Sequence, residues 1–375
     1  MTTTTRETAT GNEIAQQPAV WREVAALVAE RSDVLREFLD PVLARADLRI
    51  VLTGAGTSAF AGRVLAPGLA GRLGRRVEAV PTTDIVSNPR EVFAEDVPTL
   101  LVSFARSGDS PESAAATRLA GQCLGSVWHL IVTCNTDGRL AREHAGSTHS
   151  QVVLMPAAAN DSGFAMTSSV TSMLLATWLV LCGDPNGDTV ERVALAAEQL
   201  IADPAIATDL AGRGYQRVVY LGSGGLAGVA QESALKVLEL TAGGVVSYHD
   251  SSLGFRHGPK AVLNDRTLAV VYRSGDPYTV QYDDDIAAEL RMALGDQNVL
   301  VVSADTVPVA GALTLRPTGL TGLADAFLAA PYVVLAQQLA LQMSLALGLR
   351  PDNPFPDGTV NRVVQGVTLH PLPAA

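Results

Sequence analysis

The sequence predicts an α/β protein in which a parallel five-stranded sheet, flanked by helices in the doubly wound, flavodoxin-like manner, occurs twice. Apolar strands, glycine turns and amphipathic helices alternate along the chain, which is the pattern of a parallel sheet covered by helices. The second half repeats motifs of the first. With 375 residues, 47% of them hydrophobic and 17% charged, the chain can form two cores of about 150 residues each.

The repeat is visible as a constant spacing between matching motifs. Gly54 in LTGAG corresponds to Gly222 in LGSGG, 168 residues later, and Thr99 in TLLVSFARSGD corresponds to Thr267 in TLAVVYRSGD at the same spacing. At the RSGD turns the spacing is 167 residues. An internal duplication explains these matches.

The elements of the first half follow one another in a regular order. Five apolar segments are expected to form its strands: LRIVLT, RRVEAV, TLLVSF, WHLIVTCN and SQVVLMP. A long helix from Gly163 to Cys182 is expected to close this half. In the second half RVVYL, GVVSY, TLAVVY and VVSADT are the matching strands, and LADAFLAAPYVVLAQQLALQMSLALG is the closing helix.

Four segments are expected along the chain. Residues 1–40 form an N-terminal tail and helix, with a mobile Thr/Ala/Gly-rich stretch at 1–16 and a helix from Pro18 to Asp40 that ends at Pro41. The other segments are a first sheet domain at 41–190, a second with its connecting helix at 191–350, and a C-terminal tail at 351–375.

Charge and cysteine usage exclude several classes of function. The formal net charge is −11 and no run of Lys or Arg occurs, which speaks against nucleic acid or an anionic membrane as a partner. The three cysteines have no pair spacing and fit reduced core thiols. The N-terminal residues lack the pattern of a signal peptide, and polar residues interrupt the most apolar helices. We expect a cytoplasmic protein.

The turn GAGTS at 54–58 has the features of a phosphate-binding loop. Gly56 lets the backbone approach a ligand, and the helix that opens with Thr57 and Ser58 offers free N–H groups to an anion. The same turn also fits the G-x-G-x-x-A fingerprint of dinucleotide-binding enzymes, with Glu78 as the following acid, so a dehydrogenase remains an alternative.

A second hydroxyl-rich turn, RSGDS, follows the third strand. Ser107, Ser110 and nearby N–H groups can bind phosphate oxygens, and Arg106 supplies a positive charge. Ser110 is also suited to be an ordinary N-cap, because Pro111 follows it at the first helical position. Two hydroxyl turns at neighbouring strand ends favour one compact phosphate over a dinucleotide.

A helix in the second half carries three ionisable residues on one face. Glu232, Lys236 and Glu239 fall at positions i, i+4 and i+7, while the other faces are apolar. Taken alone, this pattern is typical of a solvated helix face with an ion pair. The loop that follows, which ends in His-Gly-Pro at His257, makes a catalytic interpretation possible.

These motifs resemble the sugar isomerase (SIS) domain family in its tandem arrangement. The motifs are GAGTS, RSGDSPES, ESALKVLE and GFRHGPKA, and the resemblance covers roughly residues 40–370. The segments FARSGDSPES, YHDSSLGFRHGPKA and DNPFPDGTVNRVVQGVTLHP resemble the branch of galactosamine-6-phosphate deaminase/isomerases, also called tagatose-6-phosphate ketose/aldose isomerases. The isomerase domain of glucosamine-6-phosphate synthase is related to this branch.

The resemblance implies roles for the candidate residues. It implies that Glu239 moves a proton between C1 and C2 of the sugar, that His257 assists ring opening and that Lys236 lies close by. A 1,2-proton shift does need a carboxylate base and a separate group with a pKa near 7. The substrate-binding residues that it implies are Thr57, Ser58, Arg106, Ser107, Ser110 and Thr167, with Gly56 in the first turn.

The function that follows is a deaminating isomerase of a 2-amino-hexose 6-phosphate, in which galactosamine 6-phosphate gives tagatose 6-phosphate and ammonia. The sequence begins MTTTT and has no N-terminal cysteine nucleophile, so we expect ammonia release rather than incorporation. The alternatives are a plain aldose/ketose phosphate isomerase and a sugar-phosphate sensor. The resemblance alone favours the galacto configuration.

Two positions differ from the synthase pattern, because Ala105 replaces a hydroxyl residue and Gln365 replaces a tail lysine. The resemblance also implies a homo-oligomer built on dimers, whose active sites combine Glu239 of one subunit with His257 of the other.

No cofactor and no metal are predicted. The run Asp283-Asp284-Asp285 is interpreted as the solvated N-terminus of a helix. The other histidines have no partner at ligand spacing in the sequence: His129, His144, His149 and His370.

Overall fold

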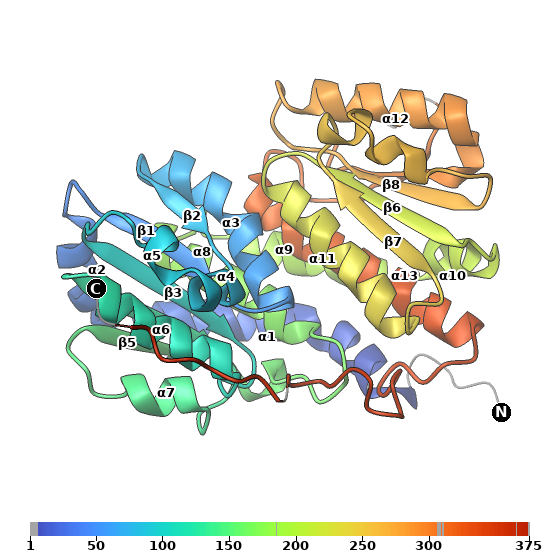
Figure 1. Ribbon diagram of the computed structural model, residues 1–375. Coiled ribbons are helices and arrows are strands. Elements are labelled where there is room, and N and C mark those ends of the chain that lie inside the picture. The colour runs from blue at the N-terminus through green and yellow to red at the C-terminus, as the bar shows by residue number, and fades with distance from the viewer. Residues whose placement is uncertain (1–6, 185, 306–308, 310, 365, 374–375) are drawn as a thin grey trace. The chain divides into compact units, whose positions relative to one another are not determined.

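The computed structural model describes residues 7–184, 186–305, 309, 311–364 and 366–373 (Figure 1). Gln365 lies outside the described residues. The chain divides into two compact units. The first-repeat unit comprises the described residues of Glu23–Asn160, Ser168–Gly183 and Gly358–Ala375, and the second-repeat unit comprises those of Met1–Arg22, Asp161–Thr167 and Asp184–Asp357.

The sheet of the first-repeat unit has five parallel strands in the order β2-β1-β3-β4-β5. They are β1 (Arg49–Thr53), β2 (Val77–Ala79), β3 (Thr99–Ala105), β4 (Val127–Thr133) and β5 (Ser150–Leu154). The helices that cover it are α3 (Thr57–Leu73), α4 (Thr82–Ser87), α5 (Pro89–Val92), α6 (Pro111–Cys123), α7 (Arg139–His144) and α8 (Ser168–Cys182). Helices α3 and α8 pack together, while α4, α5 and α6 form a separate layer.

The sheet of the second-repeat unit has the same topology, in the order β10-β9-β8-β6-β7, and is also fully parallel. Its strands are β6 (Arg217–Gly222), β7 (Val246–Asp250), β8 (Thr267–Tyr272), β9 (Val299–Val302) and β10 (Leu313–Leu315). Its helices are α9 (Thr189–Ala202), α10 (Ala205–Gly212), α11 (Gly225–Leu240), α12 (Val280–Leu294) and α13 (Asp325–Ala346). The predicted pair of five-stranded parallel sheets is therefore confirmed.

Short 3₁₀ turns lie between several of these elements. They are η2 (Ala157–Ala159), η3 (Gly254–Arg256), η4 (Pro259–Val262) and η5 (Asp296–Asn298). Turns η3 and η4 flank His257 on the loop between β7 and β8.

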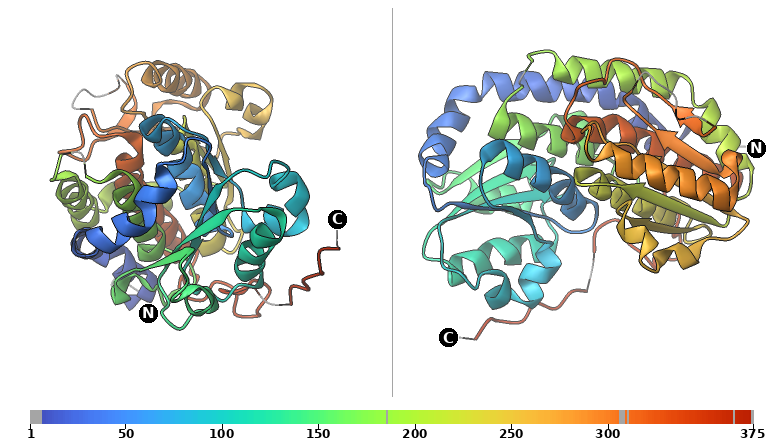
Figure 2. Two further views of the ribbon diagram at one scale, coloured as in Figure 1. Left: turned by 90° about the vertical axis from the view of Figure 1, so that its left-hand side faces the viewer. Right: turned by 90° about the horizontal axis from the view of Figure 1, so that it is seen from above.

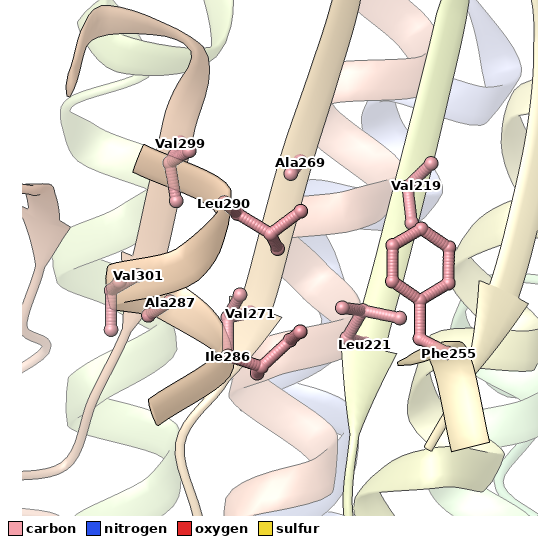
Figure 3. Packing of buried hydrophobic residues seen from close by; sticks show 10 residues of the cluster. All are labelled: Val219, Leu221, Phe255, Ala269, Val271, Ile286, Ala287, Leu290, Val299 and Val301. Carbon is pink, nitrogen blue, oxygen red and sulfur yellow. The ribbon is translucent and has the colours of Figure 1, made fainter. Parts of the chain in front are cut away.

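The central strands are buried on both faces because helices cover each side of the sheet, whereas the edge strands β2, β7 and β10 are only partly buried. Figure 3 shows one face of the second sheet, where side chains of β6, β8 and β9 meet helix α12. Phe255, which precedes His257 by two residues, is fully buried in this cluster. The core thus anchors the loop that carries the candidate catalytic histidine.

Helix α13 is the one described helix that is long and apolar enough to span a membrane, but 94% of its most apolar window is buried inside the structure. Figure 2 shows α13, in red, enclosed by other elements of its unit. It packs against α9, α10 and α11. This environment is that of a core helix.

The N-terminal region differs from the prediction. Helix α1 spans Ala9–Glu30 and α2 spans Ser32–Leu43, so the expected mobile tail is wrong from Ala9 onward. The Asp352 carboxylate accepts hydrogen bonds from the backbone N–H groups of Ala9 and Thr10, both at 2.8 Å, and thereby caps α1. The expected end at Pro41 is also wrong, because the N–H of Ala44 continues the helical bonding to Asp40.

The closing helix of the first half starts at Ser168 rather than at Gly163. The carboxylate of Glu13, on α1, accepts hydrogen bonds from the backbone N–H groups of Ser162 (2.5 Å) and Gly163 (3.1 Å). These bonds hold the residues before Ser168 in a loop, since their N–H groups point to side chains instead of to a helix.

Candidate active site

The ionisable face of α11 is buried rather than solvated. Lys236 is 0% exposed, and its Nζ lies 2.5 Å from Oε2 of Glu239 and 3.4 Å from Oε1 of Glu232. Glu232 is also buried, whereas the side chain of Glu239 is 23% exposed. The helical spacing therefore places one ammonium between two carboxylates, and only Glu239 at the end of the helix reaches solvent.

The charge state of Lys236 follows from its neighbours. Burial lowers the pKa of this ammonium, but Glu232 and Glu239 more than reverse that effect, so its pKa is raised above the ordinary value. Lys236 stays positively charged at neutral pH. Its short contact fixes the position of the Glu239 carboxylate while one edge of that carboxylate remains accessible.

His257 lies on a surface loop whose ends are secured. Its side chain is exposed, and its backbone N–H donates to the carbonyl of Gly254 at 2.9 Å. Arg256 (2.8 Å) and Lys260 both form ion pairs with Glu289 of α12. Among the described contacts of this chain, no hydrogen bond or ion pair joins His257 to Glu239.

The first candidate turn of the first-repeat unit has a backbone that requires glycine at two positions. Gly56 has φ 55° and ψ −129°, a conformation that favours glycine, and it precedes helix α3 directly. A Cβ at Gly54 would lie 2.6 Å from the backbone of Ser58, which requires glycine there too. Thr57 and Ser58 are buried at the N-terminus of α3.

The second candidate turn lies at the end of the neighbouring strand, since β3 pairs directly with β1. The Ser107 hydroxyl accepts a hydrogen bond from the N–H of Asp109 at 3.2 Å. Ser110 accepts from the N–H of Ser113 at 3.3 Å, so the N-cap interpretation is confirmed. The two turns occupy the carboxyl edge of a parallel sheet, where α/β proteins bind ligands.

Arg106 is buried beside this turn and reaches the C-terminal segment. Its Nη2 donates to the carbonyl of Arg362 at 3.0 Å. The guanidinium is therefore held by backbone of residues 358–373, which contains no helix or strand in the described part (Figure 1).

Thr167 belongs to the second-repeat unit, unlike Thr57 and Ser58. Its hydroxyl and its backbone N–H donate to the two oxygens of the buried Asp161, at 2.9 and 2.8 Å. Sequence analysis missed Asp161, and it missed Glu13, which holds the same loop. Neither residue belongs to a motif, so no local signal marked them.

The acid of the dinucleotide fingerprint has a structural role. Glu78 accepts hydrogen bonds from Arg49 (2.5 Å) and Arg76 (3.0 Å). Burial raises the pKa of Glu78, but these two guanidinium groups outweigh it and lower the pKa overall. Because both carboxylate oxygens are engaged, Glu78 does not offer the ribose contact that a dehydrogenase needs.

The predicted solvation is wrong for Asp283, which is 0% exposed. The reason is that α12 begins at Val280, so Asp283 lies on the inner face of its first turn. The partly exposed Asp284 forms a bidentate ion pair with Arg273, at 2.7 and 2.9 Å.

Two of the histidines contact each other. The rings of His129 and His144 lie 4.7 Å apart between centroids. In the described part of the chain, no group of three or more His, Cys, Asp or Glu side chains is arranged to hold a metal ion.

The chain is similar to known proteins over nearly its whole length. The SIS domain model matches residues 42–182. A Streptomyces coelicolor protein with the provisional name D-galactosamine-6-phosphate deaminase AgaS is 61% identical over 97% of this chain and 95% of its own length. D-galactosamine-6-phosphate deaminase AgaS of Escherichia coli is 44% identical, covering 97% and 96% of the two chains.

Solved structures agree with the sequence relatives. The crystal structure of tagatose-6-phosphate ketose/aldose isomerase from Escherichia coli matches with a TM-score of 0.90 at 41% identity, over 98% of both chains. The two parallel five-stranded sheets match the fold of that structure over nearly the whole chain. The chain belongs to the SIS domain family, in the branch that contains the AgaS galactosamine-6-phosphate deaminases.

Proposed function

We propose that this protein converts galactosamine 6-phosphate and water to tagatose 6-phosphate and ammonia. The observation that carries the proposal is the buried Lys236, which holds a partly accessible Glu239 carboxylate at the end of α11. Relatives that match nearly the whole chain carry the name galactosamine-6-phosphate deaminase. We place the reaction in the cytoplasm, because Cys123, Cys134 and Cys182 are all free thiols.

The chemistry divides into binding, ring opening and proton transfer. Ser107, Ser110 and the neighbouring N–H groups bind the phosphate, with Thr57, Ser58, Gly56 and Thr167 serving the sugar. His257 assists opening of the hemiacetal ring. Glu239 then removes the proton from C2, and protonation at C1 yields a C2 imine. Water hydrolyses the imine to the ketone and releases ammonia.

The buried ion pairs suit Glu239 to this role. A base that moves a proton between adjacent carbons must stay within reach of both, which requires a fixed side chain. Lys236 fixes Glu239, and Glu232 balances the charge of Lys236 inside the unit.

The decisive experiment is incubation with galactosamine 6-phosphate, glucosamine 6-phosphate and their N-acetyl forms, with ammonia and ketose phosphate measured together. We expect equal amounts of both products from galactosamine 6-phosphate. Interconversion of tagatose 6-phosphate with an aldose, without ammonia from any amino sugar, would identify a plain isomerase instead. Binding of these sugars without turnover would identify a sensor.

We also propose a homo-oligomer built on dimers, in which Glu239 of one subunit and His257 of another serve the same active site. The exposed His257 on an anchored loop supports this arrangement.

The variants Glu239→Gln and His257→Gln are each expected to be nearly inactive. After joint unfolding and refolding, about a quarter of the activity should return, because half of the dimers are mixed and each has one intact site. A mixture as inactive as its parents, with subunit exchange verified, would assign both residues to one chain.

A further inference from the structure

The second repeat retains the turn that the first repeat offers to a phosphate. Gly224 precedes α11 with φ 56° and ψ −125°, values within a few degrees of those of Gly56 before α3. A Cβ at Gly222 would lie 2.6 Å from the backbone of Leu226, the same distance as between Gly54 and Ser58. The RSGD turn is also repeated, after β8. Both units therefore contain a glycine turn and an RSGD turn at the ends of neighbouring strands.

In the second repeat a carboxylate of the chain itself bridges these two turns. Oδ1 of Asp283 accepts hydrogen bonds from the hydroxyls of Ser223 (2.7 Å) and Ser252 (2.5 Å). Its Oδ2 accepts from the backbone N–H of Ser274 at 2.9 Å. Ser223 belongs to the glycine turn and Ser274 to the RSGD turn. The carboxylate thus makes the contacts that a bound oxyanion would make.

Carboxylates also engage the Ser274 hydroxyl, the Gly275 N–H and the Arg273 side chain of the second RSGD turn. Asp325 accepts from the Ser274 hydroxyl (2.7 Å) and from the N–H of Gly275 (2.8 Å). Arg273 pairs with Asp284 and with Asp305, the latter at 2.9 Å. An external anion would have to displace these groups, at the cost of leaving them unpaired.

The first repeat has no such internal ligand at the corresponding position. At the 167-residue spacing of the RSGD turns, Asp283 corresponds to Ala116, which is buried among apolar residues of α6. We propose that the turns after β6 and β8 form a second oxyanion site whose ligand is the Asp283 carboxylate. Where the proposed function holds, the chain then binds one sugar phosphate and not two.

Substitution of Asp283 tests this assignment through stability, without use of the enzymatic activity. Asp283→Ala empties the site and leaves its donors unpaired, so the Tm should fall by roughly 5–10 °C. Formate, a small carboxylate, should then raise the Tm of this variant by roughly 3 °C or more relative to chloride at equal ionic strength.

Two control variants separate a filled site from general destabilisation. Asp283→Asn keeps the volume of the side chain, so it should lose stability without a response to formate. Leu290→Ala removes an apolar side chain of the same helix and should likewise not respond. An equal effect of formate on Asp283→Ala and Leu290→Ala would overturn the proposal. A chain with Asp283→Ala that folds only in formate supports it, and one that fails to fold in either salt overturns it.

Binding stoichiometry provides a measurement on the unmodified protein. Calorimetric titration with galactitol 6-phosphate, which has no carbonyl and cannot isomerise, should give one site per chain. Two equivalent sites would contradict the internal occupation by Asp283. Absence of any binding would count against the proposed function, whereas the formate response decides the role of Asp283 independently.

Discussion

Helices α3 and α11 each follow the first strand of a repeat. They have the same position in the fold, but they carry different side chains. At the 168-residue spacing, Glu232, Lys236 and Glu239 of α11 correspond to Val64, Gly68 and Gly71 of α3. The turns differ as well, since the carboxylates of Asp283 and Asp325 engage the turns of the second repeat. The two copies have thus kept the same backbone geometry at the glycine turn, while their side chains differ, and the proposed function assigns anion binding to one copy and acid–base chemistry to the other.

The largest expected effect on turnover comes from substitution of Glu239, the base proposed for the second repeat. Glu239→Gln keeps the contact with Lys236 but removes the proton acceptor, so kcat should fall by about 10³-fold. Galactitol 6-phosphate should still bind, because the proposed phosphate contacts belong to the other repeat. Glu191→Gln, which affects an exposed ion pair with Arg22, is the matched control and should leave kcat unchanged. Turnover by Glu239→Gln within a factor of ten of the wild type would reject Glu239 as the base.

A pair of equivalent serines gives the sharpest contrast between the repeats. Ser107→Ala removes a hydrogen bond to phosphate, and kcat/KM should fall by about ten- to a hundred-fold with the fold intact. Ser274→Ala, at the equivalent position, instead removes the hydrogen bond to Asp325 and should lower the Tm by roughly 2–8 °C. Steady-state kinetics and thermal unfolding of both variants separate the effects. Similar kinetic losses in the two variants would mean that both turns hold substrate.

The first repeat should also be the more acid-sensitive copy. Burial and the neighbouring His144 and His149 lower the pKa of His129 to about 3. In the second repeat Val299 has the corresponding strand position, because it pairs with Ala269 of β8 as His129 pairs with Leu101 of β3. Since the unfolded chain binds this proton more readily, the stability is complete above about pH 6.5 and declines as the pH falls toward 3.

Between pH 7 and pH 5 the His129 contribution to the loss of stability should be about 2 kcal/mol. Denaturant unfolding at the two pH values measures it. His129→Val should flatten the dependence, and an unchanged slope in that variant would show that other groups control acid unfolding.

The smallest expected effect concerns the loop that carries His257. Glu289→Gln breaks the ion pairs with Arg256 and Lys260, which are partly exposed and therefore weak, so kcat should fall by roughly two- to five-fold. Glu143→Gln breaks comparable ion pairs in the first repeat and should have no effect on kcat. If the two variants behave alike, Glu289 does not position the loop.

The sequence predicted the features that depend on local pattern. The glycine turns, the ionisable face of α11 and most of the strands follow from residues close together in the chain, and the structure confirms them. In the second sheet, β9 (Val299–Val302) begins and ends earlier than predicted, and β10 (Leu313–Leu315) was not predicted. The burial of Lys236 could not be predicted, because i, i+4 spacing describes a face without saying what covers it. The burial of Asp283 could not be predicted for a related reason. Its serine partners lie 60 and 31 residues away in the sequence, while its immediate neighbours are the acids of a typical helix start.

The cap on α1 can form only late in synthesis, because the capping residue lies near the other end of this sequence. Helix α1 leaves the ribosome before the two sheets, yet the carboxylate that caps it belongs to Asp352, 342 residues after Thr10. At synthesis rates of about 5–20 residues per second, this gap corresponds to roughly 17–70 s. The first sheet, which is complete by Leu154, can form during that interval. Helix α1 therefore receives its cap later than the first sheet can form, although it is synthesised earlier.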